Sequence, residues 1–195
     1  MKSARIDLFI KSLETYNFLK VFNKWETYLW SNFPINSTND IDITFIGEPS
    51  EELAEKILDF QKYVEETYEM KIDEQVFENT DVFSYIPQMN ISDFEFNNIF
   101  KYKINTHLGP RKYKSDPIKI NKYFWKYELS GMGEKNKFRL GKLNIHYPIL
   151  IKDFLQLYFN IKNPHIYNTI EDNTFNKMKK LRREYYEKIV NTRNR

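Results

Sequence analysis

The chain has 195 residues and a 41% hydrophobic content, which suits one ordinary domain with a core of its own. Its net charge of +3 is mild and spread along the chain, so nucleic-acid binding is permitted but not required. The absence of cysteine excludes disulfides, thiolate zinc sites and cysteine nucleophiles, and it is typical of a reducing compartment.

The first predicted element is an amphipathic helix over residues 6–22. Its apolar residues recur at spacings of three and four, at Leu8, Phe9, Leu13, Tyr16, Leu19 and Phe22. Charged residues interrupt this segment every few positions, which excludes a signal-peptide core and a membrane span. We therefore expect a soluble cytoplasmic protein with no membrane association.

A short strand is predicted over residues 26–30, followed by a polar loop and a second strand that starts at Asp40. The second strand alternates strictly. One face carries Ile41, Ile43 and Phe45, and the other carries Asp40, Asp42 and Thr44. The sequence thus places two carboxylates side by side on one face of a strand.

A helix is predicted over residues 48–68, because Pro49 and a cluster of glutamates favour a first turn and an apolar stripe follows. The next strand, residues 69–77, has Met70, Ile72 and Val76 on one side and Lys71, Asp73 and Gln75 on the other. A neighbouring strand of this kind can bring Asp73 next to the two earlier carboxylates.

Three carboxylates in one place repel one another unless cations neutralise them, and hard oxygen ligands suit Mg²⁺, with Mn²⁺ as a substitute. The remaining positions on Mg²⁺ are filled by water and substrate phosphates. Two such ions, roughly 3.5 to 4 Å apart, can activate an attacking hydroxyl and stabilise a leaving pyrophosphate. Asp40, Asp42 and Asp73 are therefore the candidate metal ligands.

Beyond Pro87 the pattern predicts further strands around residues 94–108, 118–129 and 137–147, with turns between them. A largely apolar, buried helix is predicted from Pro148, and a basic helix over about residues 173–190. The expected fold class is α+β, a mixed sheet with helices on one face, plus a β-hairpin and a helical C-terminal extension. We expect a core over residues 1–87 and an extension over residues 88–195 that packs on it as one compact unit.

The order of strand, polar loop, acidic strand, helix and acid-bearing strand resembles the core of the polymerase-β-like nucleotidyltransferases. The stretch "YLWSNFPINSTNDIDITFIG", residues 28–47, is similar to that superfamily's signature, and "KIDEQ", residues 71–75, resembles the strand of its third acid. The resemblance covers roughly the first 80 residues. It implies transfer of NMP from an NTP, with ATP among the candidates, to a hydroxyl on RNA, a protein or a small molecule.

By this resemblance, Asp40 and Asp42 would bind the catalytic and the nucleotide-bound metal, and Asp73 would orient or deprotonate the acceptor hydroxyl. The family's Gly-Ser pair, which contacts the triphosphate, corresponds to Ser31 and Asn32, or to Trp30 and Ser31 in another alignment. Neither alignment supplies the glycine. The alternative function is therefore a catalytically degenerate module on the same scaffold that binds nucleic acid or a protein partner, and a structural or assembly role stays open.

Other motifs in the sequence give weaker indications of a functional site. "GMG", residues 131–133, is predicted to be a hairpin turn, and the three histidines, His107, His146 and His165, have no metal-ligand spacing. The run over residues 107–127 alternates basic and aromatic residues, which suits either a solvated hairpin with inward rings or a nucleic-acid contact. The basic terminal helix permits a similar contact, although a solvated helix with its apolar side packed inward is favoured.

Overall fold

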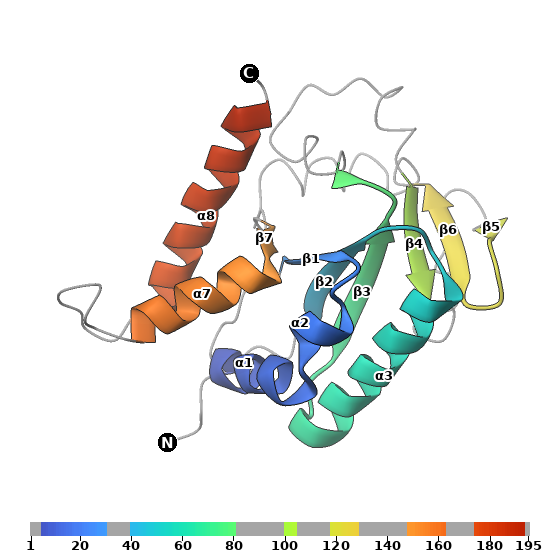
Figure 1. Cartoon of the computed structure of the whole chain (residues 1–195), viewed down its shortest axis with the longest axis horizontal. Coiled ribbons are helices and arrows are strands. Elements are labelled where there is room, and N and C mark those ends of the chain that lie inside the picture. The colour runs from blue at the N-terminus through green and yellow to red at the C-terminus, as the bar shows by residue number, and fades with distance from the viewer. Residues whose placement is uncertain are drawn as a thin grey trace.

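The computed structural model describes residues 5–30, 40–80, 100–104, 118–128, 148–162 and 174–193. The helices are α1 (Arg5–Tyr16), α2 (Phe18–Val21), α3 (Glu51–Tyr68), α7 (Ile151–Lys162) and α8 (Thr174–Arg193). The strands are β1 (Glu26–Leu29), β2 (Ile41–Ile46), β3 (Ile72–Phe77), β4 (Phe100–Ile104), β5 (Ile118–Lys119), β6 (Phe124–Glu128) and β7 (Ile149–Leu150). The fold is α+β, as the sequence predicts (Figure 1).

The strands of the described residues form one mixed sheet in the order β5-β6-β4-β3-β2-β1-β7. Strands β2 and β3 are parallel neighbours joined through α3, whereas the other recorded pairs are antiparallel. Strands β4 and β6 come from the second half of the chain and extend the sheet beside β3 (Figure 1). The N-terminal elements and the extension therefore share one sheet.

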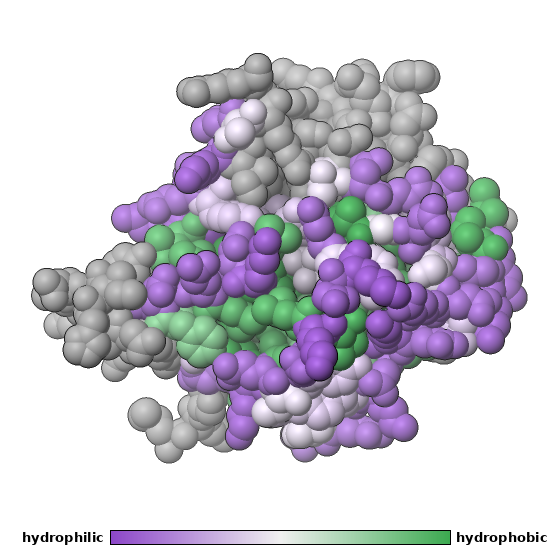
Figure 2. All heavy atoms as spheres, in the orientation of Figure 1, coloured by the Kyte–Doolittle hydropathy of each residue, from purple (hydrophilic) through white to green (hydrophobic). Residues whose placement is uncertain are grey.

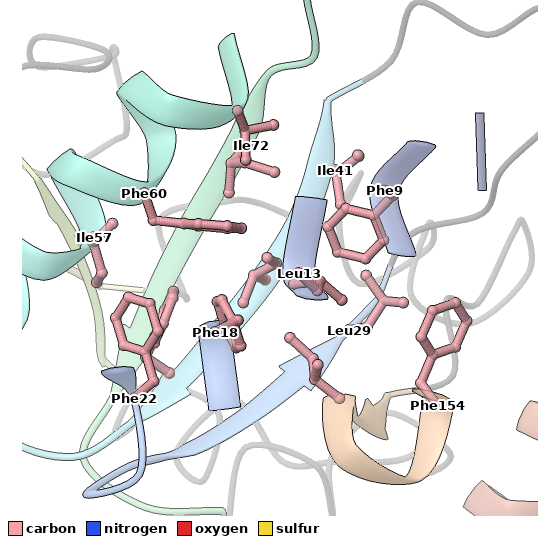
Figure 3. Packing of buried hydrophobic residues seen from close by; sticks show 14 of the residues in the cluster. Phe9, Leu13, Phe18, Phe22, Leu29, Ile41, Ile57, Phe60, Ile72 and Phe154 are labelled. Carbon is pink, nitrogen blue, oxygen red and sulfur yellow. The ribbon is translucent and has the colours of Figure 1, made fainter. Parts of the chain in front are cut away.

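The hydrophobic core lies on the face of the sheet that α1, α2 and α3 cover (Figure 3). Ile41, Ile43 and Phe45 of β2 are fully buried there, as their alternation predicts. The Phe45 ring lies 5.0 Å from that of Phe22 between centroids. Because one face of β2 is filled by this aromatic packing, Asp42 and Thr44 are left on the opposite face.

The extension packs into this same core. Tyr102 of β4, Phe124 of β6 and Phe154 of α7 all belong to the buried cluster that contains Phe9 of α1. The rings of Phe9 and Phe154 lie 6.4 Å apart between centroids. No helix among the described residues combines the length and the apolar character that crossing a membrane requires.

The first helical segment differs from the prediction of one helix over residues 6–22. Asn17 adopts the left-handed conformation, with φ 61° and ψ 43°, and separates α1 from α2. Asparagine tolerates this conformation better than most residues do, so it allows the chain to turn between two short helices. The break lets Phe18 and Phe22 both reach Phe45.

The predicted helix after Pro49 is confirmed as α3. Ser50 is its N-cap, and the Ser50 side chain accepts a hydrogen bond from the Leu53 amide at 3.2 Å. Glu51 and Glu52 lie in the first turn, where carboxylates interact favourably with the helix dipole. The buried residues of α3 hold it against the sheet, so the crossover from β2 to β3 packs on one face.

The helix predicted from Pro148 begins later, at Ile151, because residues 149–150 pair with β1 as β7. The expectation that it is buried on nearly every side is wrong, since Lys152, Gln156 and Phe159 are exposed. Figure 2 shows hydrophilic residues over much of the viewed face and apolar residues gathered in two places, across the middle beside α7 and, separately, over β5, where Ile118 and Ile120 are exposed. The predicted strand at 137–147, the "GMG" turn and the three histidines lie outside the described residues.

Gly47, directly after β2, is a position where only glycine fits. Its φ is +156°, and a Cβ built there would lie 2.7 Å from Cδ1 of Trp25. We expect Gly47→Ala to lower the free energy of unfolding by about 1–3 kcal/mol, the usual cost of forcing extra atoms into packed surroundings. Chemical denaturation of the two proteins measures this, and an unchanged midpoint would contradict the packing described here.

Candidate functional site

Two carboxylates lie side by side on the sheet face opposite the aromatic core. Asp42 of β2 and Asp73 of β3 are register partners in the parallel pair, so their side chains leave the sheet at the same level. Both are partly buried. Residues 42 and 73 are far apart in sequence, and the β2–α3–β3 crossover brings them together.

The two acids perturb each other electrostatically. Burial, and then the charge of Asp73, raises the pKa of Asp42 from 3.8 to about 6, and a hydrogen bond with Asp73 contributes in the same direction. The charges of Lys101 and Lys103 oppose this shift. A cation placed at the pair would relieve the repulsion between the carboxylates.

Lys103 of β4 already supplies one positive charge to this cluster. Its ammonium donates hydrogen bonds to Oδ1 of Asp73 and to the backbone carbonyl of Glu74, and it lies 3.6 Å from Oε1 of Glu74. The side chain is only 5% exposed. Burial alone would lower the pKa of Lys103, but the charges of Glu74 and Asp73 outweigh burial and raise it.

Glu74 anchors this arrangement from the other side of β3. Its side chain is fully buried beneath α3, where Oε2 accepts a hydrogen bond from Nε2 of Gln61 at 2.7 Å. Oε1 accepts one from the Ile104 amide at 3.0 Å. A buried carboxylate is stable only with such partners, so Gln61, Glu74 and Lys103 form a continuous polar connection from α3 to Asp73.

Two further cations lie near the acids. Burial, together with the charge of Lys103, lowers the pKa of Lys101 from 10.5 to about 8. Arg182 of α8 is buried and donates a hydrogen bond to the carbonyl of Leu29. Burial lowers the pKa of Arg182 to about 9, while the charge of Asp42 opposes this, so Arg182 stays charged at neutral pH. The site is therefore rich in charges of both signs.

Thr44 adds an unpaired polar group to the same face. It follows Asp42 by two residues on β2 and pairs in register with Gln75. The Thr44 side chain is fully buried, and its hydroxyl has no hydrogen-bond partner within the described part of the chain. A buried hydroxyl in this state leaves its donor and acceptor capacity unused.

The structure brings together Asp42 and Asp73 of the predicted metal ligands. Asp40 lies just before β2, is exposed, and interacts electrostatically with Arg5. Among the described residues there is no group of three or more His, Cys, Asp or Glu side chains placed to hold a metal ion. Ser31 and Asn32, the predicted nucleotide-contacting pair, lie outside the described residues.

Sequence reasoning did not select Lys101, Lys103, Glu74 or Arg182. The local sequence pattern did distinguish three of them, namely Lys101, Lys103 and Glu74. Lys101 and Lys103 alternate within a strand, which places both ammonium groups on one face. Glu74 falls in the apolar phase of β3, between Ile72 and Val76, and an acid in that position requires a buried partner. Nothing in the sequence of α8 distinguishes Arg182 from its basic neighbours.

Comparison with protein-family models, with curated proteins and with solved structures finds no match for this chain. Its functional reading therefore depends on the chemistry of the residues described above.

Proposed function

We propose that this protein is a metal-dependent nucleotidyltransferase that transfers NMP from an NTP to a hydroxyl acceptor. The observation that carries the proposal is the in-register pair of Asp42 and Asp73 on neighbouring parallel strands. Along the chain, the pair belongs to the order β1, β2 with Asp42, α3, and β3 with Asp73. This is the order of elements that the resemblance to the polymerase-β-like nucleotidyltransferases implies.

The residues present fit Mg²⁺. This ion is usually held by one or two carboxylates, several waters and substrate phosphates, so Asp42 and Asp73 supply a sufficient protein ligand set. The raised pKa of Asp42 reflects burial and the nearby charge of Asp73, and bound Mg²⁺ would relieve that repulsion. When bound, the metal would neutralise polyphosphate charge and lower the pKa of a coordinated hydroxyl.

The chain's own residues have separable tasks in the transfer. The acceptor oxygen forms a bond to the α-phosphorus as the bond to the β-phosphate oxygen breaks, and pyrophosphate leaves. Asp73 orients the acceptor hydroxyl and takes its proton. Lys101 and Arg182 place positive charge near the acids, where it attracts the polyphosphate and offsets charge that develops on the leaving group.

The direct test combines purified protein with each α-labelled NTP, Mg²⁺ or Mn²⁺, and RNA, protein or small-molecule acceptors. We expect a nucleotidylated product with the wild type, and a loss of at least about a hundredfold in kcat/KM for Asp73→Asn. Glu48→Gln, at an exposed carboxylate outside the cluster, is the matched control and should leave turnover unchanged. Equal turnover by Asp73→Asn and the wild type would refute the mechanism.

Asp40 needs a separate measurement. The resemblance makes it a metal ligand, whereas the structure leaves it exposed and outside the acid pair. If Asp40 joins the site only when metal and NTP bind, Asp40→Asn should lower kcat/KM about as much as Asp73→Asn. If it stays apart, the variant should keep nearly full turnover, and the metal ligands reduce to Asp42 and Asp73.

A second candidate function is favoured by the contact between Lys103 and Asp73, which gives the carboxylate a cation without any metal. In this reading the chain is a non-catalytic module on the same scaffold that binds nucleic acid or a protein partner. Its binding would weaken with salt and be indifferent to Mg²⁺. Absence of turnover with every NTP, together with salt-dependent binding of RNA or DNA that chelators do not alter, would favour this module over the enzyme.

A further inference from the structure

Arg182 is the one buried side chain among those that the structure describes on α8. Its neighbour Arg183 is exposed and pairs with Glu187, also exposed, one turn along the helix. Arg182 is 6% exposed, and its guanidinium donates a hydrogen bond to the backbone carbonyl of Leu29, the last residue of β1. The C-terminal helix therefore reaches the end of β1 through this one side chain.

We propose that Arg182 is a positioning residue for the candidate site: through it, α8 holds the end of β1 and thereby fixes Asp42 on the neighbouring strand. The placement of Asp42 is a property of the protein alone and can be measured without substrate. Only its consequence for activity rests on the proposed function.

A single peptide group links Arg182 to Asp42. The carbonyl of Leu29 and the amide of Trp30 belong to the same planar unit, and they point in opposite directions because the peptide bond is trans. The carbonyl accepts the hydrogen bond from Arg182, while the amide donates one to the backbone carbonyl of Asp42 at 3.0 Å. A rotation of this peptide group that breaks the first bond also disturbs the second. Arg182 therefore acts on Asp42 through the backbone of β1.

The position of β1 in the sheet makes this support necessary. Leu29 pairs with Ile43 of β2 on one side and with Ile149 of β7 on the other. Strand β7 has only two residues, so it supplies few ladder hydrogen bonds to β1. Helix α8 packs beside β7 at this end of the sheet (Figure 1). The guanidinium of Arg182 adds a hydrogen bond at the strand end where the ladder is shortest.

The cost of burying a guanidinium indicates a directional role. Burial lowers the pKa of Arg182 to about 9, and the charge of Asp42 opposes this shift. A methionine would fill the space without that cost, but it has no donor for the Leu29 carbonyl. Arginine presents several N–H donors in one rigid plane, which specifies where α8 sits against β1.

The test is amide hydrogen exchange, followed by NMR on the whole chain, in the wild type and in Arg182→Met. We expect the Trp30 amide to exchange at least about tenfold faster in the variant while amides of α3 change less than about twofold, because β1 opens locally. Arg183→Met removes an exposed arginine one residue along α8 and should leave the Trp30 rate within about twofold of the wild type. An unchanged Trp30 rate, or equal acceleration in α3, would overturn the proposal.

The wild type offers a measurement that does not depend on a folded variant. Most helical stability in proteins comes from tertiary packing, so α8 amides exchange when the helix leaves the sheet. We expect the amides of Arg182 and Trp30 to exchange through the same opening, with protection factors that agree within about threefold. A larger difference in either direction means that α8 and the end of β1 open independently, and the positioning role is then wrong.

Replacement by lysine separates the hydrogen bond from simple packing. Arg182→Lys keeps a positive charge and a donor on a long side chain, so the Trp30 amide should exchange within about threefold of the wild type. If Arg182→Lys opens β1 as much as Arg182→Met does, the bond to the Leu29 carbonyl is not what holds the strand, and the proposal fails.

Activity is measured separately. If the wild type transfers NMP, Arg182→Met should lower kcat/KM at least about tenfold, because small displacements of a group at the reacting centre are costly. Arg182→Lys should recover most of this loss, and Arg183→Met should retain the wild-type value. Absence of transfer by the wild type refutes the proposed function alone, since exchange at Trp30 requires no turnover. Transfer at the wild-type rate by Arg182→Met refutes the positioning role alone.

Discussion

Replacing Asp42 by asparagine is expected to stabilise the metal-free protein above pH 6 by up to about 3 kcal/mol, although it removes a proposed metal ligand. The fold raises the pKa of Asp42 from 3.8 to about 6, mainly through burial and then through Asp73. Asparagine keeps the shape of the side chain and removes the charge. A gain in stability from loss of a site residue is typical of groups retained for function.

The pH dependence of this effect has a definite sign. Because the folded-state pKa of Asp42 is higher than that of the unfolded chain, the folded state binds more protons between about pH 4 and pH 6. The Asp42 contribution to stability is therefore greatest below pH 4 and decreases as pH rises through this window. Lys101, Lys103 and Arg182 limit the decrease, because their charges favour ionised Asp42.

Urea unfolding in EDTA at several pH values, for wild type and Asp42→Asn, measures this difference. The two curves of unfolding free energy against pH should coincide near pH 4 and separate towards pH 7. Glu48→Gln is the control at an exposed carboxylate and should follow the wild type throughout. If Asp42→Asn is less stable than the wild type at pH 8, the lysines outweigh burial and Asp42 is a structural ion-pair partner.

Lys103→Met is expected to be the most destabilising single change at the site, by about 3–5 kcal/mol. The variant leaves the fully buried Glu74 carboxylate without the ammonium that lies 3.6 Å from it, and it also removes the direct contact with Asp73. The energetic penalty comes mainly from the stranded buried carboxylate and not from the lost attraction alone.

Lys101→Met provides a matched control on the same strand, two residues away. Burial lowers the pKa of Lys101 to about 8 and the charge of Lys103 adds to this, so the fold disfavours the Lys101 ammonium. Its replacement should leave stability unchanged or raise it. Lys103→Met with Glu74→Gln should recover most of the lost stability. If Lys101→Met and Lys103→Met lower the free energy of unfolding by the same amount, the specific pairing of Lys103 with Glu74 is not what stabilises this region.

Several features of the fold and the site were predictable from local sequence. Strict alternation over residues 40–46 placed Ile41, Ile43 and Phe45 in the core and Asp42 on the other face, because successive side chains of a strand point in opposite directions. The capped start of α3 and the phase of Asp73 on β3 followed from equally local rules. These predictions need only the few residues on either side.

The contacts that give the site its charge were decided by tertiary structure. Lys103 meets Asp73 across 30 positions, and Arg182 reaches the Leu29 carbonyl across 153. Such contacts depend on the sheet register and on where α8 docks, and no local sequence pattern specifies either of them. The sequence by itself determined that Asp42 and Asp73 leave their strands on the polar face. The fold decided that they stand together while Asp40 stays apart, because register, and not residue type, sets which side chains share one level of a sheet.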